Sequence, residues 1–188
     1  MCTLAEGERN DKYVDGNKFH LTVHPKYLSA AFDHISPWLF SDDNPFGIWK
    51  VTDQEVVINH LERTGVDTES LSALERKPQT DPERFYCGVQ FTFYCTPDRI
   101  EADDSGEKTS VYQVSAIKRM SLFLQELERV LSEKGIPAGI VPDSDILVPK
   151  GRYISYRKEG ISQRLGGNNE WKALMSEPMY RLITTVSE

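Results

Sequence analysis

The sequence has few cysteines, no long apolar run and no Sec-type secretion signal. Its 188 residues include three cysteines, Cys2, Cys87 and Cys95, an odd number without Cys-x-x-Cys spacing. This pattern disfavours a disulfide framework or a zinc site and favours a reducing compartment. No stretch approaches the ~20 apolar residues that cross a bilayer, and the first residues lack the basic and apolar regions of a signal peptide. We therefore expect neither a metal site nor a membrane partner.

The chain also lacks the short motifs of common nucleotide-binding and hydrolytic sites. It contains no Gly-x-x-x-x-Gly-Lys-Ser/Thr loop, no dinucleotide fingerprint, no His-Glu-x-x-His and no Gly-x-Ser-x-Gly. Its net charge of −7 should repel nucleic acid and anionic lipid. Arginines that gather in such an acidic protein therefore indicate a specific anionic ligand more strongly than they would in a basic one.

What is present is the composition of one soluble globular domain, 39% apolar and 27% charged. Residues 1–16 are polar and are expected to be flexible, and residues 17–188 are expected to form the domain. Period-two alternation predicts a strand over 17–24. Pro25 suits the start of the helix that follows, and Pro37 should kink or end that helix. The sequence further predicts a strand at 48–51 and a helix capped by Thr52 and Glu55.

The second half of the chain continues this mixture of strands and helices. Residues 64–82 read as a surface excursion, and Phe85 to Tyr94 as a central strand that buries Cys87 and Cys95 on one face. Further predictions are an acidic turn at 101–108, a long helix at 110–134, a strand at 153–156, a loop at 158–169 and a last helix from Asn169. Without regular βαβ alternation, this order predicts a single compact α+β domain, mostly antiparallel sheet packed with helices.

Two pairs of basic residues are candidates for a site. Lys18 and His20 are two apart on a predicted strand, so both point to one face, although polar residues there are also typical of a solvated face. Arg157 and Arg164 flank a glycine-containing loop. Guanidinium groups bind phosphate oxygens in pairs, and exposed backbone amides add donors. Each pair alone is a weak signal for an anion site.

Read in order, several blocks of the chain resemble one family. The family is that of the phosphothreonine lyases of the OspF/SpvC type, effectors delivered by type III secretion. The resemblance covers about residues 16–182 and rests on Lys18-Phe19-His20, Leu39-Phe40-Ser41, Trp49-Lys50-Val51-Thr52-Asp53, Gln90-Phe91-Thr92-Phe93-Tyr94, Ser144-Asp145, Tyr153-Ile154-Ser155-Tyr156-Arg157 and Glu177-Pro178-Met179-Tyr180-Arg181-Leu182. It implies a compact α+β fold and a β-elimination that needs no cofactor and leaves dehydrobutyrine.

The resemblance also implies roles for individual residues. Lys50 resembles the general base that takes the Cα proton of phosphothreonine, and His20 the general acid that protonates the departing phosphate. The phosphate-binding arginines are matched by Arg84, Arg157 and Arg164. Supporting positions are matched by Lys18, Tyr94 and Asp145, the last of which would organise an arginine. Arg84 is preferred for its Arg-x-x-x-Gly spacing before Gln90, and Arg63 is the alternative.

The chain departs from the family pattern in two respects. Thr96 stands where relatives carry a lysine that helps to receive a second phosphate, so a requirement for phosphotyrosine is left open. Residues 1–16 lack the kinase-docking pattern of the effectors, basic residues followed by spaced aliphatics.

The expected substrate is a phosphorylated protein loop, with the activation loop of a host mitogen-activated protein (MAP) kinase as the first candidate. The protein would then be a secreted bacterial effector, monomeric, acting in the host cytoplasm or nucleus. One alternative is a lyase of the bacterial cytoplasm that tailors phosphoserine and phosphothreonine in a lanthipeptide precursor. Another is a phosphopeptide-binding module without turnover, which would have no use for Lys18, His20 and Lys50 as acid–base groups.

Overall fold

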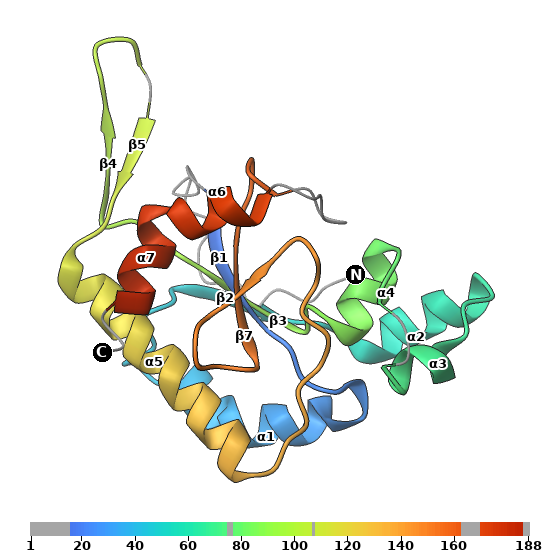
Figure 1. Cartoon of the computed structure of the whole chain (residues 1–188). Helices are drawn as coiled ribbons and strands as arrows, with labels where there is room; N and C mark the ends of the chain where they lie inside the picture. Colours follow the sequence, from blue (N-terminus) through green and yellow to red (C-terminus); the bar gives the residue numbers. More distant parts are fainter. Residues whose placement is uncertain (1–15, 75–76, 107, 163–169, 186–188) are drawn as a thin grey trace.

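The computed structural model describes residues 16–74, 77–106, 108–162 and 170–185. Most of the segment predicted to be flexible, 1–15, and Arg164 lie outside these residues. The described chain forms an antiparallel sheet with helices, and the protruding hairpin of β4 and β5 stands apart from the body (Figure 1). The predicted α+β fold with a mostly antiparallel sheet is confirmed.

The main sheet has five strands in the order β2-β3-β1-β7-β6, with β1 at its centre. Every neighbouring pair is antiparallel. The strands are β1 (Asn17–Leu21), β2 (Ile48–Val51), β3 (Phe91–Tyr94), β6 (Ile146–Leu147) and β7 (Ile154–Lys158). A separate two-stranded sheet pairs β4 (Arg99–Ala102) with β5 (Lys108–Val111). The acidic turn predicted at 101–108 is thus the end of a hairpin.

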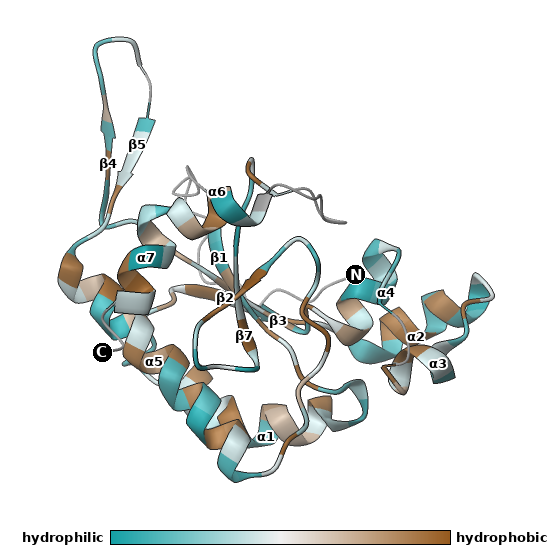
Figure 2. Ribbon diagram, viewed as in Figure 1, coloured by the Kyte–Doolittle hydropathy of each residue, from teal (hydrophilic) through white to brown (hydrophobic). Residues whose placement is uncertain are grey.

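One face of the main sheet packs against helices and forms the core. The helices are η1 (Pro25–Tyr27), α1 (Leu28–Leu39), α5 (Val114–Glu133), α6 (Glu170–Ser176) and α7 (Pro178–Thr185). Phe19 of β1, Phe93 of β3 and Tyr156 of β7 are fully buried in this core with apolar residues of α1, α5 and α7. The hydrophobic and hydrophilic bands of α5 reflect its one-sided burial (Figure 2). The opposite face of the sheet is left for polar residues.

Pro37 does not end α1 where it stands. The helix continues to Leu39. Proline has no N–H to donate to the carbonyl of Asp33, and the hydroxyl of Ser36 donates to that oxygen instead, at 3.2 Å. The helix therefore ends one half-turn later than the proline alone indicates.

Two predictions for residues 52–88 are wrong. The cap of α2 (Gln54–Arg63) is Asp53, whose side chain accepts from the N–H of Val56. Thr52 instead donates to the carbonyl of Val89. The surface excursion contains α3 (Thr68–Ser72), and α4 (Asp81–Cys87) follows it. These helices bury a second apolar cluster with α2, made of Leu61, Leu71, Tyr86 and Cys87.

The central strand is correspondingly shorter than predicted. It begins at Phe91, because Phe85 to Cys87 belong to α4. Cys87 therefore lies on a helix and Cys95 just beyond the strand, although both side chains are buried as expected. The long helix starts at Val114 rather than at residue 110, because β5 occupies the residues before it. The last strand extends to Lys158.

Candidate active site

The sheet register brings the predicted site residues together in two rows. In the first row Lys50 of β2 lies opposite Thr92 of β3, Thr92 opposite His20 of β1, and His20 opposite Ser155 of β7. The second row contains Tyr94, Lys18 and Arg157. Directly opposed residues in an antiparallel sheet share a face, as do residues two apart on one strand. All of these side chains therefore project from the sheet face that is turned away from the core helices.

This face is not a solvated one. Lys18 is 8% exposed, His20 3% and Arg157 4%, so the interpretation of the strand as solvent-facing is wrong. Burying charged and polar groups is costly unless they are paired. Such a cluster inside an acidic protein is typical of a functional site.

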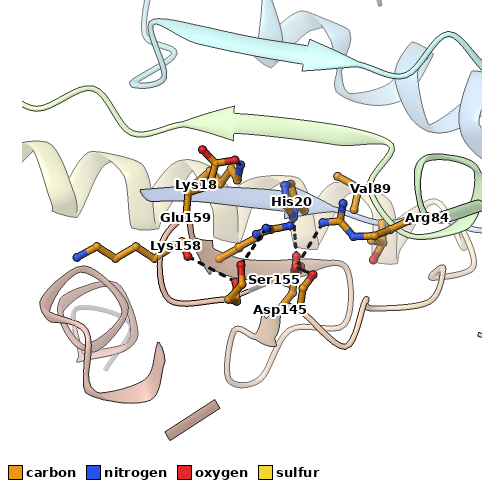
Figure 3. A network of polar contacts seen from close by, with 12 residues as sticks. Lys18, His20, Arg84, Val89, Asp145, Ser155, Lys158 and Glu159 are labelled. Carbon is orange, nitrogen blue, oxygen red and sulfur yellow. Dashed lines mark hydrogen bonds and ion pairs between the residues drawn. The ribbon is translucent and has the colours of Figure 1, made fainter. Parts of the chain in front are cut away.

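Asp145, which directly precedes β6, contacts His20 of β1. The Nδ1 atom of His20 lies 2.5 Å from Oδ2 of Asp145 (Figure 3). The hydroxyl of Ser155 donates to the same oxygen at 2.9 Å, and that of Ser144 donates to Oδ1 at 2.6 Å. Asp145 was predicted to organise an arginine. It contacts both an arginine and the histidine.

The pKa values of His20 and Asp145 both lie below their ordinary values. Burial lowers the pKa of His20, and Arg84 and Lys18 add to this effect, while Asp145 opposes it. Burial alone would raise the pKa of Asp145, but His20, Ser144 and Arg84 together hold it below its ordinary value. In the absence of an anionic ligand the pair therefore favours neutral imidazole beside carboxylate. A phosphate dianion nearby would favour the imidazolium form that a general acid needs.

Arg84 reaches this cluster from α4. A capping box of Thr80 and Glu83 starts the helix, and the guanidinium lies between two carboxylates, with Nη2 3.8 Å from Oδ1 of Asp145 and Nη1 3.7 Å from Oδ1 of Asp81. The alternative arginine, Arg63, is exposed at the end of α2 and donates to the carbonyl of Asn59 in its own helix. The structure thus brings Arg84, and not Arg63, beside His20.

Tyr94 lies between the two lysines of the face. Its ring centroid is 5.4 Å from Nζ of Lys50 and 5.9 Å from Nζ of Lys18, within the range of cation–π attraction. Burial lowers the pKa of Lys18, and Arg157 and Lys50 contribute to that shift against an opposing ion pair with Glu159. Lys18, Lys50 and Arg157 are therefore electrostatic neighbours.

Arg157 is buried, and one of its guanidinium N–H groups has no hydrogen-bond partner among the described residues. Its Nη2 donates to the carbonyl of Ser162 at 3.0 Å. Its Nε is buried and has no hydrogen-bond partner among the residues that the structure describes. An unsatisfied buried donor is costly, and a phosphate oxygen would satisfy it. The second arginine of this loop, Arg164, falls outside the described ranges.

Sequence reasoning missed three polar residues of the site: Ser144, Ser155 and Glu159. Ser155 and Glu159 are each two residues from Arg157, so the alternation along β7 was a usable signal for both. Ser144 carried no such signal, because its role depends on the loop that brings Asp145 to His20.

No metal or membrane feature accompanies these residues. Nowhere in the described ranges do three His, Cys, Asp or Glu side chains gather as a metal site would require. No helix in the described part of the chain is long and apolar enough to cross a membrane. Two hollows, of about 240 and 470 Å³, lie elsewhere, the first against α5 and the second between β5 and α7.

The site combines His20, Lys18, Lys50 and the buried Arg157 on one sheet face with the buried Arg84 of α4. This arrangement is typical of an enzyme that transfers protons on a substrate carrying a compact anion. Comparison with known proteins narrows the class: the model of the OspF/SpvC family matches residues 4–185, and the chain belongs to that family.

Individual relatives agree with this assignment. A protein of Salmonella typhimurium named MAPK phosphothreonine lyase is 35% identical over 169 residues, which are 90% of this chain and 58% of that protein. A solved phosphothreonine lyase structure is matched with a TM-score of 0.72 and 33% identity, over 96% of this chain and 71% of that one. The phosphothreonine lyase effector VirA of Chromobacterium violaceum is matched with a TM-score of 0.68 and 33% identity, over 97% and 76%. The chain thus spans less than two thirds of the length of the Salmonella relative.

Proposed function

We propose that this protein is a phosphothreonine lyase, which removes phosphate from a phosphorylated threonine by β-elimination. The observation that carries the proposal is the first row of the site, in which Lys50 and His20 flank Thr92 on one face of the sheet. Two strand spacings of about 4.8 Å place their Cα atoms roughly 10 Å apart. That separation leaves room for one phosphothreonyl residue between a base and an acid.

The proposed step needs no water. Neutral Lys50 removes the Cα proton, and the electrons of the C–H bond form a double bond between Cα and Cβ. The bond from Cβ to the phosphate oxygen breaks, and the departing oxygen takes a proton from Nε2 of His20. Asp145 holds Nδ1 of the same ring and stabilises the imidazolium before transfer. The products are dehydrobutyrine in the peptide and inorganic phosphate.

The cations of the site have a separate task in this proposal. Arg84 and Arg157 bind the phosphate oxygens, with Arg164 as a further candidate, and Lys18 and Tyr94 support the substrate and the leaving group. Guanidinium groups suit this task because they stay charged and bind oxygens in pairs.

The substrate and setting are proposed from the relatives. Because the Salmonella relative is named for MAP kinases, we propose the activation loop of a host kinase as the substrate. The Chromobacterium relative is described as an effector, so we propose that this protein too is secreted and acts in the host cytoplasm or nucleus. We further propose that it acts as a monomer. These relatives favour a kinase loop over a lanthipeptide precursor.

Mass spectrometry of a phosphothreonine peptide tests the reaction. After incubation with the protein, the peptide should lose the mass of phosphoric acid and gain a dehydroamino acid that adds thiols. A product that lacks only HPO₃, with its hydroxyl restored, would instead mean hydrolysis by a phosphatase. Tight binding without any product would mean a phosphopeptide-binding module.

A further inference from the structure

Two serine hydroxyls contact the carboxylate of Asp145. Ser155 of β7 lies directly opposite His20 of β1, and its hydroxyl donates to Oδ2 of Asp145 at 2.9 Å (Figure 3). Ser144 immediately precedes Asp145, and its hydroxyl donates to Oδ1 at 2.6 Å. The ring of His20 contacts Oδ2 through Nδ1, at 2.5 Å. Both oxygens of the carboxylate therefore accept a serine hydroxyl, and one of them also contacts the histidine.

These four side chains are buried together. Ser155 has no exposed surface, and Ser144, Asp145 and His20 are each no more than 3% exposed. Burying a carboxylate is costly unless a counter-ion and hydrogen bonds stabilise its charge. A hydrogen bond to a charged oxygen is also stronger in such surroundings than in water. The two hydroxyls therefore contribute directly to keeping Asp145 ionised.

The charged groups around this pair come from several elements of the fold. Arg84 of α4 lies 3.8 Å from Oδ1 of Asp145 and lowers the pKa of that carboxyl. Arg84 also lowers the pKa of His20, as does Lys18, two residues away on β1. The other charged groups of the region are Asp81 beside Arg84, Glu159 beside Lys18, Lys50 of β2 and Arg157 of β7. The serine hydroxyls differ from the cations, because they stabilise the carboxylate without repelling a proton on His20.

The position of one proton decides whether His20 can act as an acid. Beside an ionised Asp145, a doubly protonated ring can give its Nε2 proton to the departing oxygen. A more basic carboxylate would instead take the Nδ1 proton, and the neutral ring left behind would hold its Nε2 proton far more tightly. Hydrogen bonds to the carboxylate favour its ionised form over its protonated form. The hydroxyls therefore favour the arrangement in which the ring is the acid.

We propose that Ser155 and Ser144 are positioning residues, which hold Asp145 as a carboxylate and thereby keep the transferable proton on His20. Both hydroxyls donate to Asp145, so they act on the acid rather than on the substrate. This inference rests on the proposed lyase function for its effect on rate. Its effect on the titration of His20 can be measured in the protein without substrate.

NMR of the Cε1–H groups of histidine tests the effect on titration. The chain has four histidines, and the resonance of His20 is the one that is absent from the spectrum of His20→Asn. Ser155→Ala removes a donor from the carboxylate, which then attracts a proton more strongly, so the titration midpoint of His20 should rise by about one pH unit. Ser144→Ala should shift the midpoint in the same direction, and the double variant should shift it further than either.

Ser155→Cys separates the effect of the hydroxyl from that of its volume. A thiol fills a similar space but is a weak donor, so the midpoint of His20 should rise in this variant as well. Ser121→Ala is the matched control, because it removes an equally buried hydroxyl that donates to the carbonyl of Ile183 at 3.1 Å, in the helical part of the core. It should leave the midpoint of His20 unchanged.

Turnover of a phosphothreonine peptide tests the effect on rate. Ser155→Ala should lower kcat by about tenfold, because less of the bound enzyme carries the acid in its active form. KM should stay nearly unchanged, because Arg84 and Arg157, the proposed phosphate ligands, are not altered. Ser121→Ala should turn over at the wild-type rate.

A midpoint of His20 that Ser155→Ala leaves in place would overturn the role of the serines and leave the lyase function standing. So would a midpoint that moves in Ser155→Ala but not in Ser155→Cys, since altered packing would then be the cause. A raised midpoint with wild-type kcat would overturn the effect on the reaction. Absence of elimination by the wild-type protein would overturn the proposed function, whatever the midpoint of His20 shows.

Discussion

His20 and Asp145 form a buried pair across 125 residues of sequence, with Nδ1 of the ring 2.5 Å from Oδ2 of the carboxylate. The contact fixes which ring nitrogen faces the aspartate and leaves Nε2 for the substrate. Asp145 also lies 3.8 Å from Nη2 of Arg84. One carboxylate therefore positions both the proposed acid and a proposed phosphate ligand.

Replacing Asp145 with Asn should slow elimination and change its pH dependence. Burial lowers the pKa of His20 and the Asp145 carboxylate opposes that effect, so a neutral amide should lower the pKa further. The acid must be protonated to act, so kcat should begin to fall at a lower pH than in the wild type. Its maximum should drop by about two to four orders of magnitude. Stopped assays of phosphate release across pH measure both changes.

Asp143→Asn is the control for that variant. Asp143 is exposed two residues away and pairs with Lys77 at 2.5 Å, so the same chemical change there should leave the pH profile in place. A slower Asp145→Asn enzyme with an unshifted profile would mean that Asp145 only supports the fold.

Lys50→Ala should abolish elimination and retain phosphopeptide binding. The variant removes the proposed base but leaves Arg84 and Arg157, which carry the proposed phosphate contacts. Fluorescence anisotropy of a labelled peptide measures binding, and mass spectrometry measures product. The exposed Lys26 provides the control Lys26→Ala, which should turn over normally. Persistent elimination by Lys50→Ala would assign the base to another residue.

The sequence predicted the face of β1 and failed on the helix that carries Arg84. Alternation alone placed Lys18 and His20 together, because strand geometry depends on local residues. The run from Phe85 to Cys87 was misread as strand, although the capping box of Thr80 and Glu83 marked a helix start. Contacts such as His20 with Asp145 depend on tertiary packing, and no local pattern predicts them.

Arg84→Lys should raise KM for the phosphopeptide by about tenfold to a hundredfold. Lysine keeps the charge beside Asp145 but loses the paired donors of the guanidinium fork, and hydrogen bonds to charged groups contribute about 1.5–3 kcal/mol each. Arg63→Lys makes the same change on exposed α2 and should leave KM unchanged. Initial rates over a range of peptide concentrations distinguish the two arginines. An effect of Arg63→Lys equal to that of Arg84→Lys would contradict the assignment made from the structure.

Gly139→Ala should destabilise the protein by about 1–3 kcal/mol, the usual cost of an added methyl group in a well-packed place. A Cβ at Gly139 would lie 2.5 Å from the carbonyl oxygen of Val23 and 2.8 Å from that of Cys87. Both obstacles are backbone, so no side chain can move aside. The segment at Gly139 lies between the chain after β1 and the end of α4. There the N–H of Ile140 donates to the carbonyl of Cys87 at 3.0 Å.

The segment at Gly139 contacts both the chain that follows the strand of His20 and the helix that carries Arg84. The added methyl group should therefore lower kcat/KM as well as stability. Urea unfolding measures the first effect, and assays well below the unfolding midpoint measure the second. Gly47→Ala is the control, because a Cβ there would come no closer than 3.9 Å to Oγ1 of Thr96, and its effect on stability should stay within about 0.5 kcal/mol. Equal stability of the two variants would show that the backbone around Gly139 can accommodate a Cβ, contrary to the distances in the structure. A destabilised Gly139→Ala protein with full kcat/KM would show that the separation of Arg84 and His20 does not depend on this segment.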